Sequence, residues 1–250
     1  MSGIAIIGGS GLTQLEGLDI VRREVVHTPY GEPSGPVTHG ILHGREVVFL
    51  ARHGYGHTIP PHKVNYRANI WALKSLGVER VVAVNSVGGI SEDMAPGTLA
   101  IPDQIVDYTW GRAHTFFDGD GAPVTHVEFT YPYCGDLRRA LIEAGREAGV
   151  PLRERGTYAA TQGPRLETAA EIERFARDGC DMVGMTGMPE AALARELDLC
   201  YACCAVVVNW AAGRGPGDGR IPMTEIERWL REGMARVRRL LERLFGSFGD

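Results

Sequence analysis

Short apolar runs that end in glycine or polar residues recur along the whole chain and alternate with amphipathic helical patterns. We expect strands at 4–7, 46–51, 80–84, 98–106, 156–161, 181–185 and 201–208. Helices are expected at 64–77, 135–148, 168–178, 189–197 and from 224 to about 245, with capping pairs Thr168/Glu171 and Thr224/Glu227. This alternation predicts an α/β fold, a single domain over 1–250 with a central mixed β-sheet flanked by helices.

Composition excludes several classes of protein. With 44% hydrophobic and 23% charged residues, the chain is typical of a globular protein. A net charge of −5 argues against a nucleic-acid partner, and the basic residues of 228–243 are expected to form a solvated helical face. No apolar run reaches the roughly 18 residues of a membrane span, and the N-terminus does not resemble a signal peptide. We therefore expect a cytoplasmic protein.

The five cysteines include a Cys-x-x-Cys pair, Cys200 and Cys203, with Cys204 beside it. This spacing can indicate zinc or redox chemistry, but no second ligand pair accompanies it. Strand alternation sends Cys200 and Cys203 to opposite faces of a sheet. We therefore expect buried, inert thiols.

The residues that follow the strands carry most of the polar chemistry. The clusters are GGSG (8–11), RHG (52–54), NSVGG (85–89), TQGPRLE (161–167), MTGMPE (185–190) and NWAAG (209–213). Glycine, serine and asparagine also serve ordinary turns, so a single cluster says little. In α/β sheets, however, ligands bind at the carboxyl ends of the strands. Six such clusters predict one shared site.

Hydroxyl, imidazole and guanidinium groups dominate these clusters, a donor set suited to a free phosphate ion. We expect Ser10, Arg52, His53, Ser86 and Thr186 to contribute to it. Arg52 offers a rigid fork of donors, although it could instead form a structural ion pair. The GGSG loop is neither GxGxxG nor a Walker loop, so a dinucleotide or ATP site is disfavoured.

Other chemistries find little support in the sequence. His53 and His57 have helical spacing, but Gly54-Tyr55-Gly56 between them disfavours a helix, and acidic residues do not cluster at ligand spacing. We predict no metal. A Gly-x-Ser-x-Gly elbow is absent, and no carboxylate stands out to activate water for a nucleoside hydrolase.

Four stretches carry a resemblance to a known family: IIGGSGL, ARHGYGHTIPPHKVNYRANIWALK, TQGPRLETAAE and MTGMPEAALAREL. They resemble the trimeric purine nucleoside phosphorylase family, and more narrowly its methylthioadenosine phosphorylase branch, from about residue 3 to 245. The resemblance implies a homotrimer that cleaves a purine nucleoside with inorganic phosphate, with no cofactor. A non-catalytic nucleoside- or phosphate-binding module is the alternative outside the enzymes.

The resemblance also assigns roles to residues. It places Ser10, Arg52, His53, Asn85, Ser86 and Thr186 around phosphate, with Arg52, His53 and Asn209 as the catalytic residues. It places Met185 under the ribose, Leu166, Glu167 and Asn209 around the base, and Met223 and Ile226 around the 5′ substituent. His126 would reach the site of a neighbouring subunit, and the 108–133 segment around it matches the family least well.

The residue at 209 departs from the adenosine-type pattern, which has Asp there and two positions later. This chain has Asn209 and Ala211. An amide can donate to O6 of a 6-oxopurine and accept from a protonated N7, and the Glu167 carboxylate can accept the N1 proton. The alternatives are a strand-end turn residue at 209 and a helix-dipole role for Glu167. The pair favours a 6-oxopurine over adenine.

Met223 and Ile226 lie one turn apart at a helix start, where they could equally be ordinary core. An apolar wall suits a methylthio group, whereas a 5′-hydroxyl needs a polar partner. We therefore expect phosphorolysis of S-methyl-5′-thioinosine to hypoxanthine and 5-methylthioribose 1-phosphate. Methylthioadenosine and inosine or guanosine are the alternative substrates.

Overall fold

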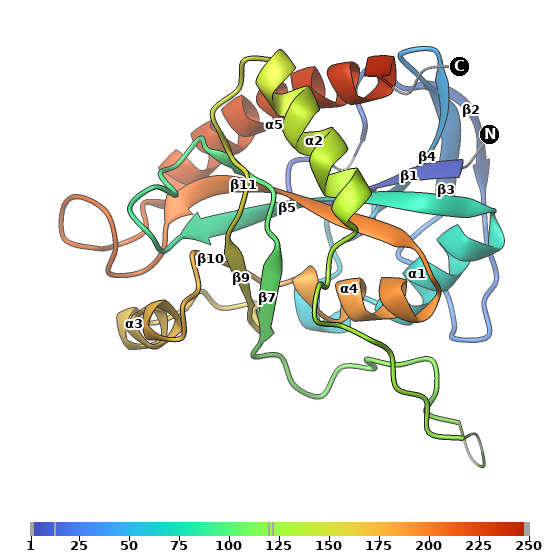
Figure 1. Ribbon diagram of the computed structural model, residues 1–250, viewed down its shortest axis with the longest axis horizontal. Helices are drawn as coiled ribbons and strands as arrows, with labels where there is room; N and C mark the ends of the chain where they lie inside the picture. The colour runs from blue at the N-terminus through green and yellow to red at the C-terminus, as the bar shows by residue number, and fades with distance from the viewer. Residues whose placement is uncertain (1–2, 13, 120, 122, 248–250) are drawn as a thin grey trace.

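A long central strand, β5 (Val78–Gly89), organises one mixed sheet (Figure 1). The computed structural model describes residues 3–12, 14–119, 121 and 123–247. β5 pairs in parallel with β1 (Gly3–Gly8) along its first half and with β11 (Cys200–Trp210) along nearly its whole length. At its end it pairs antiparallel with β10 (Met182–Gly184). The apolar composition of β5 and β11 fits this position, because both faces of a central strand are covered.

The remaining strands extend the sheet on both sides. Beyond β1 lie β4 (Arg45–Ala51), β3 (Val37–Leu42) and β2 (Asp19–Glu24). Beyond β10 lie β9 (Thr157–Ala160) and β7 (Gln104–Asp107), while β6 (Leu99–Ala100) and β8 (Leu152–Arg153) continue from β11. The expected mixed sheet is confirmed. The single strand expected at 98–106 is wrong, because β6 ends before Pro102, which has no N–H to donate.

The helices lie where the periodicity predicts them, with ends shifted by a few residues. They are α1 (Tyr66–Ser75), α2 (Gly135–Glu147), α3 (Ala169–Arg177), α4 (Gly187–Glu196) and α5 (Met223–Ser247), with a short 3₁₀ turn, η1 (Pro61–Lys63). The capping box of α3 is confirmed: Glu171 N donates to Thr168 Oγ1 at 3.1 Å, and Thr168 N donates to Glu171 Oε2 at 2.7 Å. This cap fixes the segment that carries Glu167.

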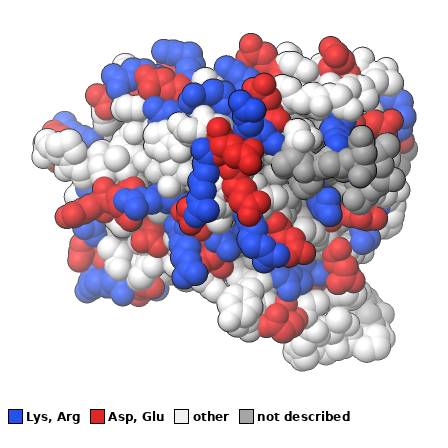
Figure 2. Space-filling model, turned by 45° about the horizontal axis from the view of Figure 1, so that its top comes forward, with Lys and Arg blue, Asp and Glu red and all other residues white. Residues whose placement is uncertain are grey.

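Helices cover both faces of the sheet. α2 and α5 lie on one face and α1 and α4 on the other (Figure 1), and each pair closes a separate apolar core. The exposed face near α2 and α5 carries interspersed acidic and basic side chains (Figure 2). Arg228 pairs with Glu232 at 3.5 Å and Arg238 with Glu16 at 2.6 Å, so the basic residues form the expected solvated face.

The cysteines differ from the expectation. Cys134 and Cys200 form a disulfide that joins the start of α2 to the start of β11. The expectation that Cys200 is a free thiol is therefore wrong. The spacing did not reveal the pair because its partner lies 66 residues away. Cys203 and Cys204 are free and buried, and burial raises the pKa of both thiols.

None of the helices in the described part of the chain combines the length and the apolar character that crossing a membrane requires.

Candidate active site

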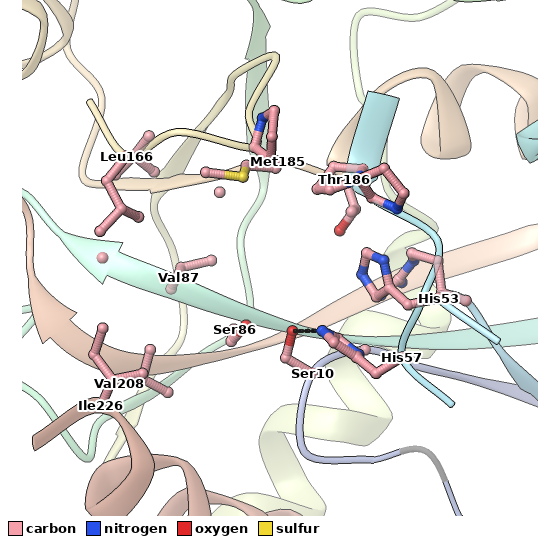
Figure 3. A pocket seen from close by; sticks show the side chains of 18 of the residues that line it. Ser10, His53, His57, Ser86, Val87, Leu166, Met185, Thr186, Val208 and Ile226 are labelled. Carbon is pink, nitrogen blue, oxygen red and sulfur yellow. Dashed lines mark hydrogen bonds between the residues drawn. The ribbon is translucent and has the colours of Figure 1, made fainter. Parts of the chain in front are cut away.

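The six strand-end clusters meet at one cavity of about 620 Å³. Its walls include Ser10 after β1, His53 after β4, Ser86 in β5, Glu167 after β9, Thr186 after β10 and Asn209 at the end of β11. The expectation of a shared site is confirmed. Figure 3 shows polar side chains from Ser10, His53, His57 and Thr186 at one end of the cavity. Leu166, Val87, Val208 and Ile226 lie at the other.

The turn after β1 is tight and approaches the sheet closely. Leu12 N donates to Gly9 O at 3.0 Å, and Gly11 has a φ of 79°, a conformation that suits glycine. A Cβ on Gly9 would lie 2.5 Å from the carbonyl oxygen of Val84. The glycines therefore let the Ser10 hydroxyl sit at the polar end of the cavity.

Arg52 lines the cavity but is fully buried, and its charge is paired. Its Nε donates to Glu190 Oε2 at 2.7 Å and its Nη2 to Glu190 Oε1 at 2.8 Å. Nη1 donates to the Val84 carbonyl at 3.1 Å. Burial lowers the pKa of this guanidinium, but the Glu190 carboxylate outweighs it, so the net shift is upward. Arg52 therefore forms the structural ion pair and also lies at the cavity wall.

His53 is held as a neutral imidazole. Its Nδ1 lies 2.8 Å from the carbonyl oxygen of Ile59, which can only accept, so Nδ1 carries the hydrogen and Nε2 is left as an acceptor. Burial, together with the nearby charge of Arg52, lowers the pKa of His53 to about 4. At neutral pH this ring can therefore accept a hydrogen bond from a protonated phosphate oxygen.

Asn85 does not lie on the cavity wall. It is 1% exposed, and its Nδ2 donates to Thr186 Oγ1 at 2.8 Å, while its Oδ1 accepts from Arg52 Nη2 at 3.3 Å. The expectation that Asn85 contacts phosphate is corrected in this respect, because the side chain lies behind Thr186 and orients it. Ser86, the next residue of β5, lines the cavity instead.

The segment from His57 to Pro61 forms a wall that the sequence analysis did not assign. His57 has a left-handed backbone, with a φ of 51°. Its Nε2 lies 3.5 Å from Ser10 Oγ, and its ring centroid lies 4.8 Å from that of His53. Sequence reasoning considered His57 only as a metal ligand, and the turn at Gly54–His57 that swings it over the cavity has no periodic signal.

The carboxylate of Glu167 is anchored at one oxygen. Thr161 Oγ1 donates to Glu167 Oε1 at 2.6 Å, and Thr161 itself is buried at the end of β9. The other oxygen, Oε2, keeps its capacity to accept a hydrogen bond. Half-buried at the rim, Glu167 is therefore a positioned acceptor.

A β-bulge at the end of β11 places two consecutive residues on the cavity. The register with β5 shifts between Val207 and Asn209, so that Val208 is the extra residue. Both Val208 and Asn209 then line the cavity, which strict alternation would prevent. Asn209 Nδ2 donates to the Trp210 carbonyl at 2.7 Å. The amide thus bonds the backbone of the next residue, yet it retains one N–H and its carbonyl oxygen.

Most of the other expected substrate residues line the same cavity. They are Leu166, Met185, Met223 and Ile226. Met223 is 64% exposed, so this side of the cavity is open to solvent in the single chain. His126 does not line the cavity; it is exposed on the long segment between β7 and α2.

Arg112 joins the segments that carry the base end and the phosphate end. It is 9% exposed, and its guanidinium donates to the carbonyls of Thr161, Gln162, Met185 and Met188 at 2.6 to 3.1 Å. Its Nε donates to Gln162 Oε1 at 3.1 Å. Sequence reasoning missed Arg112, because a lone arginine in an irregular segment gives no signal.

Among the residues that the structure describes, no group of three or more His, Cys, Asp or Glu side chains is arranged to hold a metal ion. The cavity wall presents the hydroxyls of Ser10 and Thr186 and the rings of His53 and His57 at one end, and it also carries the Glu167 carboxylate and the Asn209 amide.

Comparison with known proteins shows which family this fold and cavity belong to. Residues 3–246 match the phosphorylase superfamily, and the chain belongs to that family. It is 58% identical to a probable S-methyl-5′-thioinosine phosphorylase of Pseudomonas syringae pv. tomato, over 99% of this chain and 100% of the relative. It is 54% identical to the 6-oxopurine nucleoside phosphorylase of Pyrococcus furiosus, over 85% of this chain and 81% of the relative.

Among solved structures, the chain is similar to methylthioadenosine phosphorylase from Schistosoma mansoni in complex with adenine. The TM-score is 0.93 at 33% identity, covering 98% of this chain and 91% of that one. The family resemblance and the fold expected from the sequence are both confirmed, and the chain is a phosphorylase-type enzyme.

Proposed function

We propose that the protein cleaves S-methyl-5′-thioinosine with inorganic phosphate, releasing hypoxanthine and 5-methylthioribose 1-phosphate. The observation that carries this proposal is the placement of Asn209 and Glu167 on one cavity with an apolar wall and an anion subsite. The relatives named for methylthioinosine and for 6-oxopurine nucleosides support the same base.

The anion subsite supplies the nucleophile. Hydroxyls of Ser10, Ser86 and Thr186 and the acceptor nitrogen of His53 surround its polar end. Cleavage of the glycosidic bond builds positive charge on the sugar, as in other glycosyl transfers, and a phosphate held beneath the ribose stabilises and then captures it. Positioning and electrostatics therefore account for most of the catalysis.

The base end stabilises the departing purine. The remaining oxygen of Glu167 can accept the N1 proton of hypoxanthine. The Asn209 amide keeps the one donor and the acceptor that O6 and a protonated N7 require. Adenine would mismatch both groups. At roughly 1–3 kcal/mol for each unpaired group, discrimination of about 100-fold follows.

The 5′ end favours a thioether. Val208, Met223 and Ile226 offer apolar surface at the cavity. An inosine 5′-hydroxyl would lose water there without a partner from these side chains. This wall supports methylthioinosine over inosine.

We further propose a cytoplasmic homotrimer that needs no cofactor. The segment between β7 and α2 carries exposed Trp110, Val124 and Tyr131 as well as His126, surface that a second copy would cover. The open side of the cavity at Met223 is where a neighbouring His126 would complete the 5′ pocket. Light scattering, and complementation of a His126→Ala subunit by an Asn209→Ala subunit, test this assembly.

A comparison of specificity constants tests the substrate. We expect kcat/KM to rank methylthioinosine above inosine and above methylthioadenosine, with phosphate present. A higher value for methylthioadenosine would refute the reading of the base, and a higher value for inosine would refute the apolar 5′ pocket. Turnover without phosphate would indicate a hydrolase, and binding without turnover a non-catalytic module.

A further inference from the structure

The anion subsite lacks an uncompensated positive charge among its strongly buried residues. Arg52 is the only arginine or lysine on the described cavity wall, and both of its carboxylate contacts go to the fully buried Glu190. Much of the Arg52 charge is therefore committed to the Glu190 carboxylate. A phosphate dianion bound here would be stabilised by a further positive charge nearby.

His53 cannot provide that charge. Its Nδ1 hydrogen is committed to the Ile59 carbonyl, and burial and Arg52 hold the ring neutral. Protonation at Nε2 would place a second buried cation against Arg52. His53 therefore acts as an acceptor rather than as a counterion.

His57 lies at the mouth of the same subsite and faces it from the solvent side. Its Nε2 is 3.5 Å from Ser10 Oγ, its ring lies 4.8 Å from that of His53, and the side chain is exposed (Figure 3). Its left-handed backbone is set by the turn in which His57 N donates to Gly54 O at 3.1 Å. The His57 ring is therefore in contact with solvent, whereas the His53 ring is buried.

Apart from His57, no ionisable group on the described cavity wall is placed to supply this positive charge. On the cavity wall the other ionisable groups are Arg52, His53 and Glu167. Elements next to it carry Tyr55 on the turn after β4, His62 and Lys63 in η1, and Glu225 and Glu227 at the start of α5. None of these five is a residue of the cavity wall.

We propose that His57 provides the positive charge of the phosphate subsite, so that anion binding is coupled to uptake of one proton by this imidazole. The inference rests on the proposed phosphate site. It makes His57 a binding residue for the co-substrate, and it predicts that the anion binds more weakly as the solution becomes alkaline.

Sulfate is the probe that isolates the protein's proton, because phosphate itself titrates near neutral pH whereas sulfate stays a dianion. We would measure the inhibition constant of sulfate against phosphate from pH 6 to 8.5. Calorimetry in two buffers of different ionisation enthalpy would count the protons taken up. For the native protein we expect the inhibition constant to rise about tenfold per pH unit at the alkaline end, with proton uptake on binding.

Three variants assign the effect. Asparagine tolerates a left-handed backbone, so His57→Asn removes the imidazole with little strain. We expect about tenfold weaker sulfate binding at pH 6, no pH dependence and no proton uptake. His57→Lys should bind sulfate tightly across the range. His43→Asn is the matched control, because His43 is exposed with a φ of 50° and lies outside the cavity wall; it should behave as native.

The outcomes separate this inference from the proposed function. If sulfate competes with phosphate but His57→Asn keeps the native pH dependence and proton uptake, His57 is not the source of the charge and the inference is overturned. If the native protein does not use phosphate, the proposed function itself fails; if it uses phosphate but sulfate does not compete at any pH, only the inference about His57 is overturned.

Discussion

At the scale of single residues, the proposed function assigns the choice of base to Asn209. An aspartate at this position would accept but not donate, so it would lose O6 and could accept from the amino group of adenine. We expect Asn209→Asp to lower the ratio of kcat/KM for methylthioinosine over methylthioadenosine by roughly tenfold or more. The shift should be incomplete because Glu167 remains.

The ratio is measured within one variant, so any loss of folded protein cancels. This matters because the Asn209→Asp variant would also lose the bond that the native amide makes to the Trp210 carbonyl. An unchanged ratio would show that residue 209 does not read position 6 of the base.

His53 links the site to acid stability. Its folded pKa of about 4 lies below the usual value for histidine, mainly because of burial. Between these values the unfolded chain binds a proton that the folded chain does not. The part of the unfolding free energy that depends on a neutral His53 is therefore fully present above about pH 6.5. It is lost as the pH falls towards 4, by roughly 3 kcal/mol.

We expect the free energy of unfolding from urea titrations to show this loss in the native protein. His53→Gln should remove that part of the slope between pH 6.5 and 4, whatever its stability at neutral pH. Identical slopes for the two proteins would rule out a neutral, buried His53.

At the scale of elements, Arg112 holds two loops in register. Its guanidinium binds carbonyls on both sides of the cavity, in 161–162 and in 185–188. Arg112→Met would leave these acceptors unpaired, and we expect a loss of about 3 kcal/mol in unfolding free energy. Because both loops contribute residues to the cavity wall, kcat should fall as well.

Arg220→Met is the matched control, since the Arg220 side chain is 90% exposed and its ion pair, with Asp218 at 3.5 Å, lies at the surface. It should leave urea midpoint and kcat near native values. Native kinetics in Arg112→Met would show that the loops keep their positions without this guanidinium.

The elements also show what the sequence could predict. Ser10, His53, Ser86, Thr186 and Asn209 were predictable because each directly follows, or lies within, an apolar strand, and strand ends converge at one edge of the sheet. The orientation of Asn85 behind Thr186 could not be predicted. The sequence alone does not show which of two neighbouring strand residues, Asn85 or Ser86, lies on the cavity wall. Arg112 was missed because its partners are backbone oxygens 49 to 76 residues away.

At the scale of the whole molecule, the Cys134–Cys200 disulfide ties α2 to the central sheet across 66 residues. By loop-closure entropy such a bond stabilises the folded chain by roughly 4 kcal/mol. We expect a reductant, or the double change Cys134→Ser and Cys200→Ser, to lower Tm, and the double variant to be insensitive to reductant. A native Tm that does not respond to a reductant shown to open the bond would contradict this assignment.

The bulge at Val208 divides β11 into a part that packs in the cores and a part that lines the cavity. Upstream of it, β11 alternates between two apolar cores, and a changed side chain there disturbs packing on one face or the other. From Val208 on, two adjacent positions line the cavity, and the proposed function puts one beside the sugar substituent and the other beside the base. Substitutions at these two neighbouring positions could therefore alter the fit to the sugar substituent and to the base while the buried part of the strand stays constant.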